Sequence, residues 1–174
     1  MTPVALLVRA LALALADFPQ FNASLGADGQ SLILKKYVNI GVAVETPNGL
    51  LVPVLKGADA MTLAEIARGI TASAEKARTK GLPAAEMAGS SMSLSSLGHI
   101  GGTGFTPIVN APDVAILGAT AIQLRPRPES DGGIAWRKTL PLSLSYDHRV
   151  INGADAARFV RAIGEIFSGD ALWP

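Results

Sequence analysis

The sequence predicts an α/β domain in which a sheet with mixed strand directions packs against flanking helices. The chain has 174 residues, of which 49% are hydrophobic and 17% charged, so it is long and apolar enough to bury one core. Segments of alternating or β-branched residues recur between segments with helical periodicity. No internal repeat, linker or low-complexity segment divides the chain. We therefore expect a single domain over residues 1–174.

The composition narrows the functional classes. The net charge is +1 and no block of like charges occurs, which gives no support for a nucleic acid or an anionic membrane as partner. The absence of cysteine excludes disulfides, thiolate nucleophiles and cysteine-ligated metals. Only two histidines are present, His99 and His148, which argues against a histidine-rich metal site. A chain this apolar, with so few charges, predicts an oligomer with large buried interfaces.

The first helix is predicted by Thr2-Pro3, an N-cap followed by proline at the first helical position, and it extends to Asp17. The helix is apolar nearly all round, so it should be buried on most sides. Residues 4–16 share Ala-x-Ala patterns with signal peptides. However, Arg9 interrupts the run, no positive charge precedes it, and it is shorter than the roughly 20 residues that span a bilayer. We interpret the segment as a buried helix.

Turn, capping and alternation signals define the remaining elements. They predict, in chain order, a polar loop over residues 21–30, a hairpin over 38–55 whose clearest strand is 37–44, a capped helix from Thr62 to Gly81, strands over 91–96, 114–119 and 140–146, a hairpin centred on 131–133, and a last helix over 152–167. The hydrophobic tail leaves two alternatives open: Trp173 folds back on its own domain, or it anchors in a neighbouring subunit.

A glycine-rich loop, Leu97 to Gly104, follows the strand at 91–96. It matches neither the dinucleotide-binding spacing nor the P-loop spacing, and Pro107 argues against a helix at its end. Nucleotide cleavage and hydride transfer are therefore disfavoured. We interpret the loop as a close-packed crossing of the backbone.

His148 lies in a polar corner between the strand at 140–146 and the last helix. As a metal ligand it lacks partners. It is either a structural histidine satisfied by hydrogen bonds or a general base, because histidine titrates near neutral pH and such corners are accessible to ligands. Asn152, four residues further on, is a candidate to fix the imidazole tautomer or the backbone of the corner.

A serine nucleophile is the rival interpretation, but the sequence contains no G-x-S-x-G elbow. A serine hydroxyl can instead donate a hydrogen bond to a developing oxyanion. Ser95 and Ser96 lie at a strand end beside the glycine loop, which suits that role.

Asp147-His148-Arg149-Val150-Ile151-Asn152-Gly153 resembles the D-H-R-x-x-D-G signature of the 2-oxoacid dehydrogenase complex acyltransferases, the E2 core proteins, with asparagine where the signature usually has aspartate. The resemblance extends collinearly from about Thr2 to about Phe167. The other segments that carry it are residues 35–44, 46–54, 95–98 and 108–118. The sequence around the glycine loop and Asn110-Ala111-Pro112 is most similar to the sequences of the dihydrolipoamide acetyltransferases of bacterial pyruvate dehydrogenase complexes.

This resemblance implies a fold, a reaction and a site. The fold would be a mixed-sheet sandwich with flanking helices, like chloramphenicol acetyltransferase. His148 would be the general base that takes the thiol proton of coenzyme A or of dihydrolipoamide. Ser95 would stabilise the oxyanion and Asn152 would orient the corner. Coenzyme A and the lipoyl group would be substrates, and neither a metal nor a nucleotide redox cofactor would be needed.

The resemblance also implies partners. Family cores are trimers in which histidine and serine come from different chains, and trimers assemble further into a 24-mer or a 60-mer. Lipoyl domains and the other components of the complex would be partners, in the bacterial cytoplasm or the mitochondrial matrix. Family catalytic domains carry a helix and a strand before the segment equivalent to residues 2–17. We therefore expect a core domain without lipoyl or peripheral-subunit-binding domains, which is either an N-terminally truncated fragment or a genuinely short core protein.

Several functions remain open at this point. The chain is either an active acyltransferase core or a structural or binding module of the same fold with little turnover. Succinyl and branched-chain acyl groups are alternatives to acetyl, because enzymes of this family that transfer different acyl groups differ only in the side chains that line the acyl pocket. A small-molecule acetyltransferase of the chloramphenicol type is disfavoured because the sequences of the hairpin over 38–55 and of the glycine loop resemble those of the E2 proteins.

Overall fold

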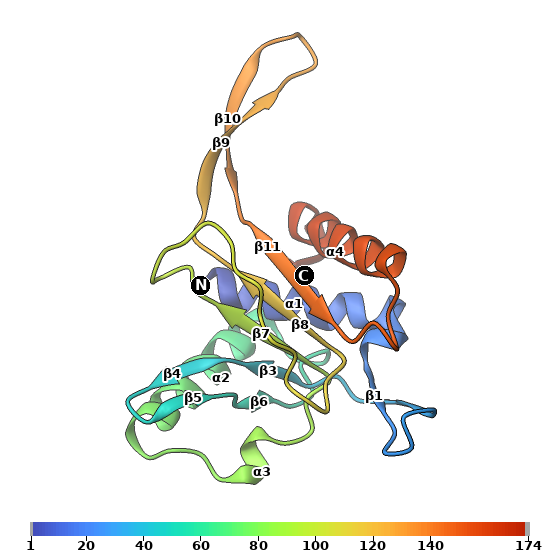
Figure 1. Cartoon of the computed structure of the whole chain (residues 1–174). Coiled ribbons are helices and arrows are strands. Elements are labelled where there is room, and N and C mark those ends of the chain that lie inside the picture. The colour runs from blue at the N-terminus through green and yellow to red at the C-terminus, as the bar shows by residue number, and fades with distance from the viewer. Residues whose placement is uncertain (1, 173–174) are drawn as a thin grey trace.

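A computed structural model describes residues 2–172 of the chain. A five-stranded sheet forms its centre, and the three long helices pack against it (Figure 1). The helices are α1 (Pro3–Asp17), α2 (Leu63–Thr79), the short α3 (Ala84–Met87) and α4 (Gly153–Ser168), with 3-10 turns η1 (Pro19–Phe21) and η2 (Asp170–Leu172). No helix within residues 2–172 is long and apolar enough to cross a membrane.

The central sheet has the strand order β11-β8-β7-β3-β6. Its strands are β3 (Ile40–Val42), β6 (Val54–Leu55), β7 (Met92–Ser96), β8 (Ala115–Ala119) and β11 (Leu142–Tyr146). The pairs β3–β7 and β7–β8 are parallel, whereas β11–β8 and β3–β6 are antiparallel. The predicted α/β class with a mixed sheet and flanking helices is therefore confirmed.

Three two-stranded antiparallel ribbons extend from this sheet. They are β1–β2 (Ala23–Leu25 and Leu32–Leu34), β4–β5 (Val44–Thr46 and Gly49–Leu51) and β9–β10 (Gln123–Pro128 and Ile134–Thr139). The β9–β10 ribbon projects furthest from the body of the molecule, at the top of Figure 1. The hairpins predicted over 38–55 and around 131–133 are both present, the first as β3–β6 continued by β4–β5.

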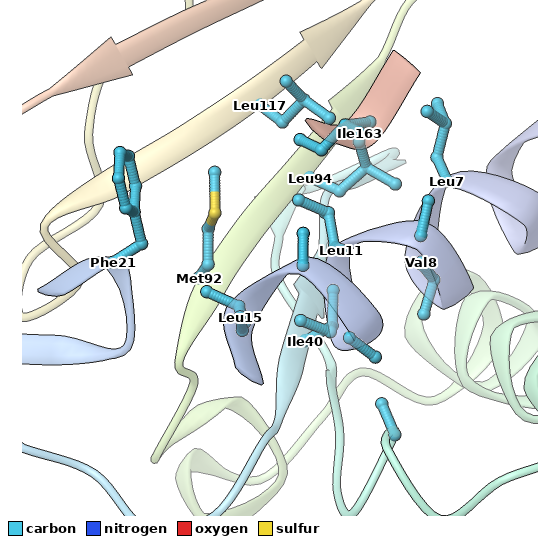
Figure 2. Close-up of a cluster of buried hydrophobic side chains, with 14 of the residues drawn as sticks. Leu7, Val8, Leu11, Leu15, Phe21, Ile40, Met92, Leu94, Leu117 and Ile163 are labelled. Carbon is cyan, nitrogen blue, oxygen red and sulfur yellow. The ribbon is translucent and has the colours of Figure 1, made fainter. Parts of the chain in front are cut away.

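Helix α1 supplies the centre of the core. Leu7, Leu11 and Leu15 are almost completely buried and belong to the same cluster as Met92 and Leu94 of β7 (Figure 2). Apolar side chains on nearly every face of this helix exclude water on most sides, as the sequence predicted. The Thr2 hydroxyl accepts a hydrogen bond from the Ala5 N–H, which confirms the predicted N-cap.

The capping box of α2 is also present. The Thr62 hydroxyl accepts from the Glu65 N–H at 3.3 Å, and the Glu65 carboxylate accepts from the Thr62 N–H at 2.8 Å. These bonds satisfy N–H groups that the helix cannot pair internally.

The prediction of a polar loop over residues 21–30 is wrong for the first half of that segment. Phe21 ends the η1 turn, is fully buried, and stacks on Phe159 of α4 with ring centroids 4.0 Å apart. Residues 23–25 then form β1. The strand predicted over 37–44 is interrupted as well, because only Ile40–Val42 pairs in the central sheet. Trp173, for which two positions were expected, lies outside the described residues.

Candidate active site

The corner that carries His148 begins where β11 ends at Tyr146. The Asp147 N–H donates to the carbonyl of Val114 at 2.8 Å, and the Asp147 carbonyl accepts from the N–H groups of Val150 and Ile151, each at 3.0 Å. These bonds close a tight turn that holds His148 outward. The imidazole is exposed, and its only aromatic neighbour in the described chain is Tyr146, with ring centroids 5.5 Å apart.

The carboxylate of Asp147 is bound to Arg149 and is not directed at His148. Arg149 donates from Nε to Oδ1 at 2.9 Å and from Nη2 to Oδ2 at 2.6 Å, and its N–H also donates to Oδ1. These bonds hold the pKa of Asp147 below its usual range. The pair therefore stiffens the corner, and the imidazole remains free to meet a substrate from outside.

Asn152 joins the corner to α4. Its Oδ1 accepts from the Asp155 N–H at 2.9 Å, and its Nδ2 donates to the Asp155 carboxylate at 2.8 Å. Asn152 is thus the N-cap of α4. Both polar groups of the Asn152 side chain therefore bond to Asp155, and the two roles expected for it remain predictions.

Ser95 and Ser96 end strand β7, where side chains alternate between the two faces of the sheet. Met92 and Leu94 face the helices and are fully buried. Ser95 shares the opposite face with Ser93 and lies at the junction of two cavities of about 570 Å³ and about 460 Å³. Ser95 is therefore accessible to ligands from two sides.

The glycine loop forms the predicted close-packed crossing of the backbone only at its beginning. Gly98 does lie close to other backbone, because a Cβ there would meet the Thr120 carbonyl oxygen at 3.1 Å. Gly101 and Gly102 instead have positive φ angles and open space around them. The loop carries His99 to the wall of the 570 Å³ cavity that Ser95 also lines. No pattern in the sequence indicates this position of His99.

Ser95 and His148 do not meet within one chain. Ser95 pairs with Gly118, whereas Tyr146, two residues before His148, pairs with Ala115 at the other end of β8. The Cα atoms of Ser95 and Tyr146 are therefore three residues apart along the strand direction and two strands apart across the sheet. These offsets correspond to a separation of roughly 14 Å, and His148 follows two residues after Tyr146. A single reacting carbonyl cannot contact both side chains of the same chain.

A buried polar cluster includes Ser93, which shares a face of β7 with Ser95, and no local sequence pattern indicates this cluster. Asp113 is buried and accepts hydrogen bonds from Ser90 and Ser93 at 2.5 and 2.7 Å. The Lys35 ammonium lies 3.9 Å from the Asp113 carboxylate and donates to the Ser90 carbonyl at 2.6 Å. Burial lowers the pKa of Lys35, and the Asp113 charge opposes that shift. The cluster anchors Lys35 and Asp113 to the segment that includes β7.

Within residues 2–172, no group of three or more metal-ligating side chains gathers. The corner and the serine strand instead offer an exposed imidazole and a hydroxyl donor. Together they suit proton transfer and oxyanion stabilisation in an acyl transfer. The chain belongs to the family of 2-oxoacid dehydrogenase acyltransferases, whose catalytic-domain description matches residues 1–171.

Among characterised relatives, the chain is 53% identical over 169 residues to the dihydrolipoyllysine-residue acetyltransferase component of the pyruvate dehydrogenase complex from Azotobacter vinelandii. The match covers 97% of this chain and 26% of that protein, so the chain spans about a quarter of the relative's length.

Solved structures agree with this relationship. The A. vinelandii dihydrolipoamide acetyltransferase matches with a TM-score of 0.96 and 50% identity over 100% of this chain and 72% of its own. The cubic core of a pyruvate dehydrogenase multienzyme complex matches with a TM-score of 0.96 and 51% identity over the same shares. A chloramphenicol acetyltransferase matches with a TM-score of 0.62 and 16% identity over 97% of this chain and 78% of its own, a likeness of fold alone.

The A. vinelandii enzyme has been investigated for the roles of a serine, a histidine and an asparagine in its catalytic mechanism. Its histidine and asparagine have the same spacing as His148 and Asn152. Counted back from the histidine without a gap, its serine falls on Ser96, one residue after Ser95.

Proposed function

We propose that this chain transfers an acetyl group between dihydrolipoamide and coenzyme A, as part of the oligomeric core of a 2-oxoacid dehydrogenase complex. Its membership of the acyltransferase family and its identity to acetyltransferases of pyruvate dehydrogenase complexes support this reaction. The observation that carries the mechanism is the position of His148, exposed on a rigid corner at the opposite end of β8 from Ser95.

His148 is the general base. It takes the proton from the thiol of coenzyme A, and the resulting thiolate attacks the thioester carbonyl of acetyl-dihydrolipoamide. The Ser95 hydroxyl donates to the oxyanion of the tetrahedral intermediate. The intermediate collapses with loss of the dihydrolipoyl thiolate, which receives the proton back from His148. No acyl-enzyme forms, and Asn152 acts by holding the corner to α4.

The active centre in this proposal lies between two copies of the chain. His148 of one copy meets Ser95 of another, because the separation within one chain is too large. Homotrimers provide this pairing, and trimers associate further into a 24-mer or a 60-mer. The cubic core among the similar structures and the exposed apolar side chains of the chain support such assembly. Lipoyl domains and the other components of the complex are its partners.

The test is a coenzyme A-dependent assay with acetyl-dihydrolipoamide as donor. The expected result is turnover that falls about 10²- to 10⁴-fold in His148→Ala, the range of a general base. Arg161→Ala is the control, since it shortens an exposed side chain of α4 and lines neither cavity beside Ser95. Background turnover that His148→Ala leaves unchanged would contradict the proposal and favour a non-catalytic core module.

A further inference from the structure

Two of the five asparagines in the chain, Asn48 and Asn152, are followed directly by glycine. Asparagine is chemically labile because the backbone nitrogen of the next residue can attack its side-chain carbonyl carbon. A side chain on that next residue hinders the attack, and glycine has none. Both positions therefore have the local sequence that favours deamidation, and their surroundings in the fold decide which one reacts.

Asn48 lies in an exposed turn whose hydrogen bonds leave its carboxamide free. Thr46 pairs with Gly49, so Pro47 and Asn48 form the two-residue turn of the β4–β5 ribbon. The Thr46 hydroxyl donates to the Gly49 carbonyl at 2.7 Å and accepts from the Asn48 N–H at 3.3 Å. Within the described residues 2–172, neither of these bonds nor any other holds the Asn48 carboxamide.

The attacking residue at this turn is also unhindered. Gly49 has a φ angle of 110°, and no atom lies within 4 Å of the place where a Cβ would stand. The turn is the tip of a ribbon, where the backbone moves more easily than inside a sheet or a helix. The Gly49 nitrogen can therefore reach the Asn48 side chain through local motion alone.

Asn152 has the same following residue but the opposite surroundings. Its Oδ1 accepts from the Asp155 N–H at 2.9 Å, and its Nδ2 donates to the Asp155 carboxylate at 2.8 Å. Gly153 is the first residue of α4, so its nitrogen belongs to the first turn of that helix. Attack on the Asn152 side chain therefore requires the N-cap and the first turn of α4 to open together.

We propose that Asn48 is a site of spontaneous deamidation and, through its isoaspartyl product, a methyl-acceptor site for a protein isoaspartate methyltransferase. The Gly49 nitrogen forms a bond to Cγ of Asn48, the Cγ–Nδ2 bond breaks, and ammonia leaves with the Gly49 proton. Water then opens the resulting five-membered succinimide ring at one of its two carbonyl carbons. Opening at Cγ gives aspartate, and opening at the main-chain carbon gives isoaspartate. The methyltransferase moves a methyl group from the sulfonium of S-adenosylmethionine to an oxygen of the isoaspartyl α-carboxylate.

The modification changes the charge beside the cavity that Ser95 lines. Thr46 and Gly49, on either side of the turn, both line the 570 Å³ cavity, as does Glu45. Each product places a carboxylate between Thr46 and Gly49, and isoaspartate also adds one carbon to the main chain of the turn. Deamidation thus converts a neutral turn next to Glu45 into an anionic one.

The test is incubation of the intact chain at neutral pH and physiological temperature, followed by tryptic peptide mapping. Trypsin releases Asn48 in the peptide 37–56 and Asn152 in the peptide 150–158, and tandem mass spectrometry separates Asn48 from Asn39. We expect deamidation of Asn48 to be about tenfold or more faster than that of Asn152, because Asn152 reacts only when its cap opens. In the chain unfolded in denaturant the two rates should agree within about twofold, because no cap then protects Asn152.

An isoaspartate methyltransferase with labelled S-adenosylmethionine should methylate the peptide 37–56 of the incubated chain. The matched control is Asn48→Gln, whose longer side chain would have to close a six-membered ring. It should abolish both deamidation and methylation of that peptide and leave Asn152 unchanged. Equal rates at Asn48 and Asn152 in the folded chain would overturn the inference. Aspartate without isoaspartate at position 48 would also overturn it, since direct hydrolysis forms no succinimide. Neither readout requires an acyl donor, so both are independent of the proposed function.

Discussion

Ser95 and His148 lie at opposite ends of β8, one on the parallel neighbour of that strand and the other beyond its antiparallel neighbour. The register of β7, β8 and β11 thus separates the Ser95 hydroxyl from the exposed His148 imidazole by a distance greater than the length of a thioester group. For this reason we infer that each reacting centre combines residues of two copies.

The first prediction separates the two adjacent serines. Ser95→Ala should lower kcat about 10²-fold, the loss expected for one oxyanion donor, with little change in thermal stability. Ser96→Ala should leave kcat near the unaltered value, because Ser96 points to the other face of β7 and, unlike Ser95, does not line the 460 Å³ cavity. Steady-state kinetics of both variants decide the matter. A larger loss in Ser96→Ala would transfer the oxyanion role to Ser96.

A second prediction concerns Asn152, which caps α4. Asn152→Ala should lower the free energy of unfolding by about 1 kcal/mol, because the Asp155 N–H loses its acceptor. Asn152→Ser keeps a capping oxygen and should retain both the stability and most of the turnover. Denaturant titration and kinetics of the pair provide the check. Turnover lost in Asn152→Ser at unchanged stability would show that the amide acts on the imidazole instead.

Local sequence signals predict the parts of this fold that depend on local chemistry. Thr2-Pro3, the Thr62–Glu65 box and the alternation of Met92 and Leu94 specify their own elements, and each lies where it is expected. Phe21 falls in a predicted loop because its burial depends on Phe159, far away in the sequence. Contacts between distant segments leave no periodic pattern in either one.

The candidate site likewise has features that the sequence indicates and features that it does not. The residue types at Ser95, His148 and Asn152, together with their places at a strand end and in a polar corner, indicate their chemistry from the sequence alone. Their separation along β8 depends on strand register, which the sequence of one strand does not encode. The pairing of Lys35 with Asp113 was missed for the same reason, since neither residue carries a local signal for the other.

The third prediction tests that buried pair. Lys35→Met should lower the free energy of unfolding by about 3–5 kcal/mol, because it leaves the buried Asp113 carboxylate without its cation. Lys36→Met is the matched control, since Lys36 is exposed, and it should have almost no effect. Chemical denaturation of the two variants gives the comparison. Equal stability of both would mean that Ser90 and Ser93 suffice to hold the carboxylate.

The most direct test of the shared active centre is complementation between two inactive variants. His148→Ala and Ser95→Ala chains are purified separately, mixed, dissociated in denaturant and reassembled, and acetyl transfer is then assayed. Random mixing should give assemblies in which about one quarter of the centres have both side chains intact, with activity restored in that proportion. Mixed assemblies of unaltered size that stay as inactive as either parent would contradict the account.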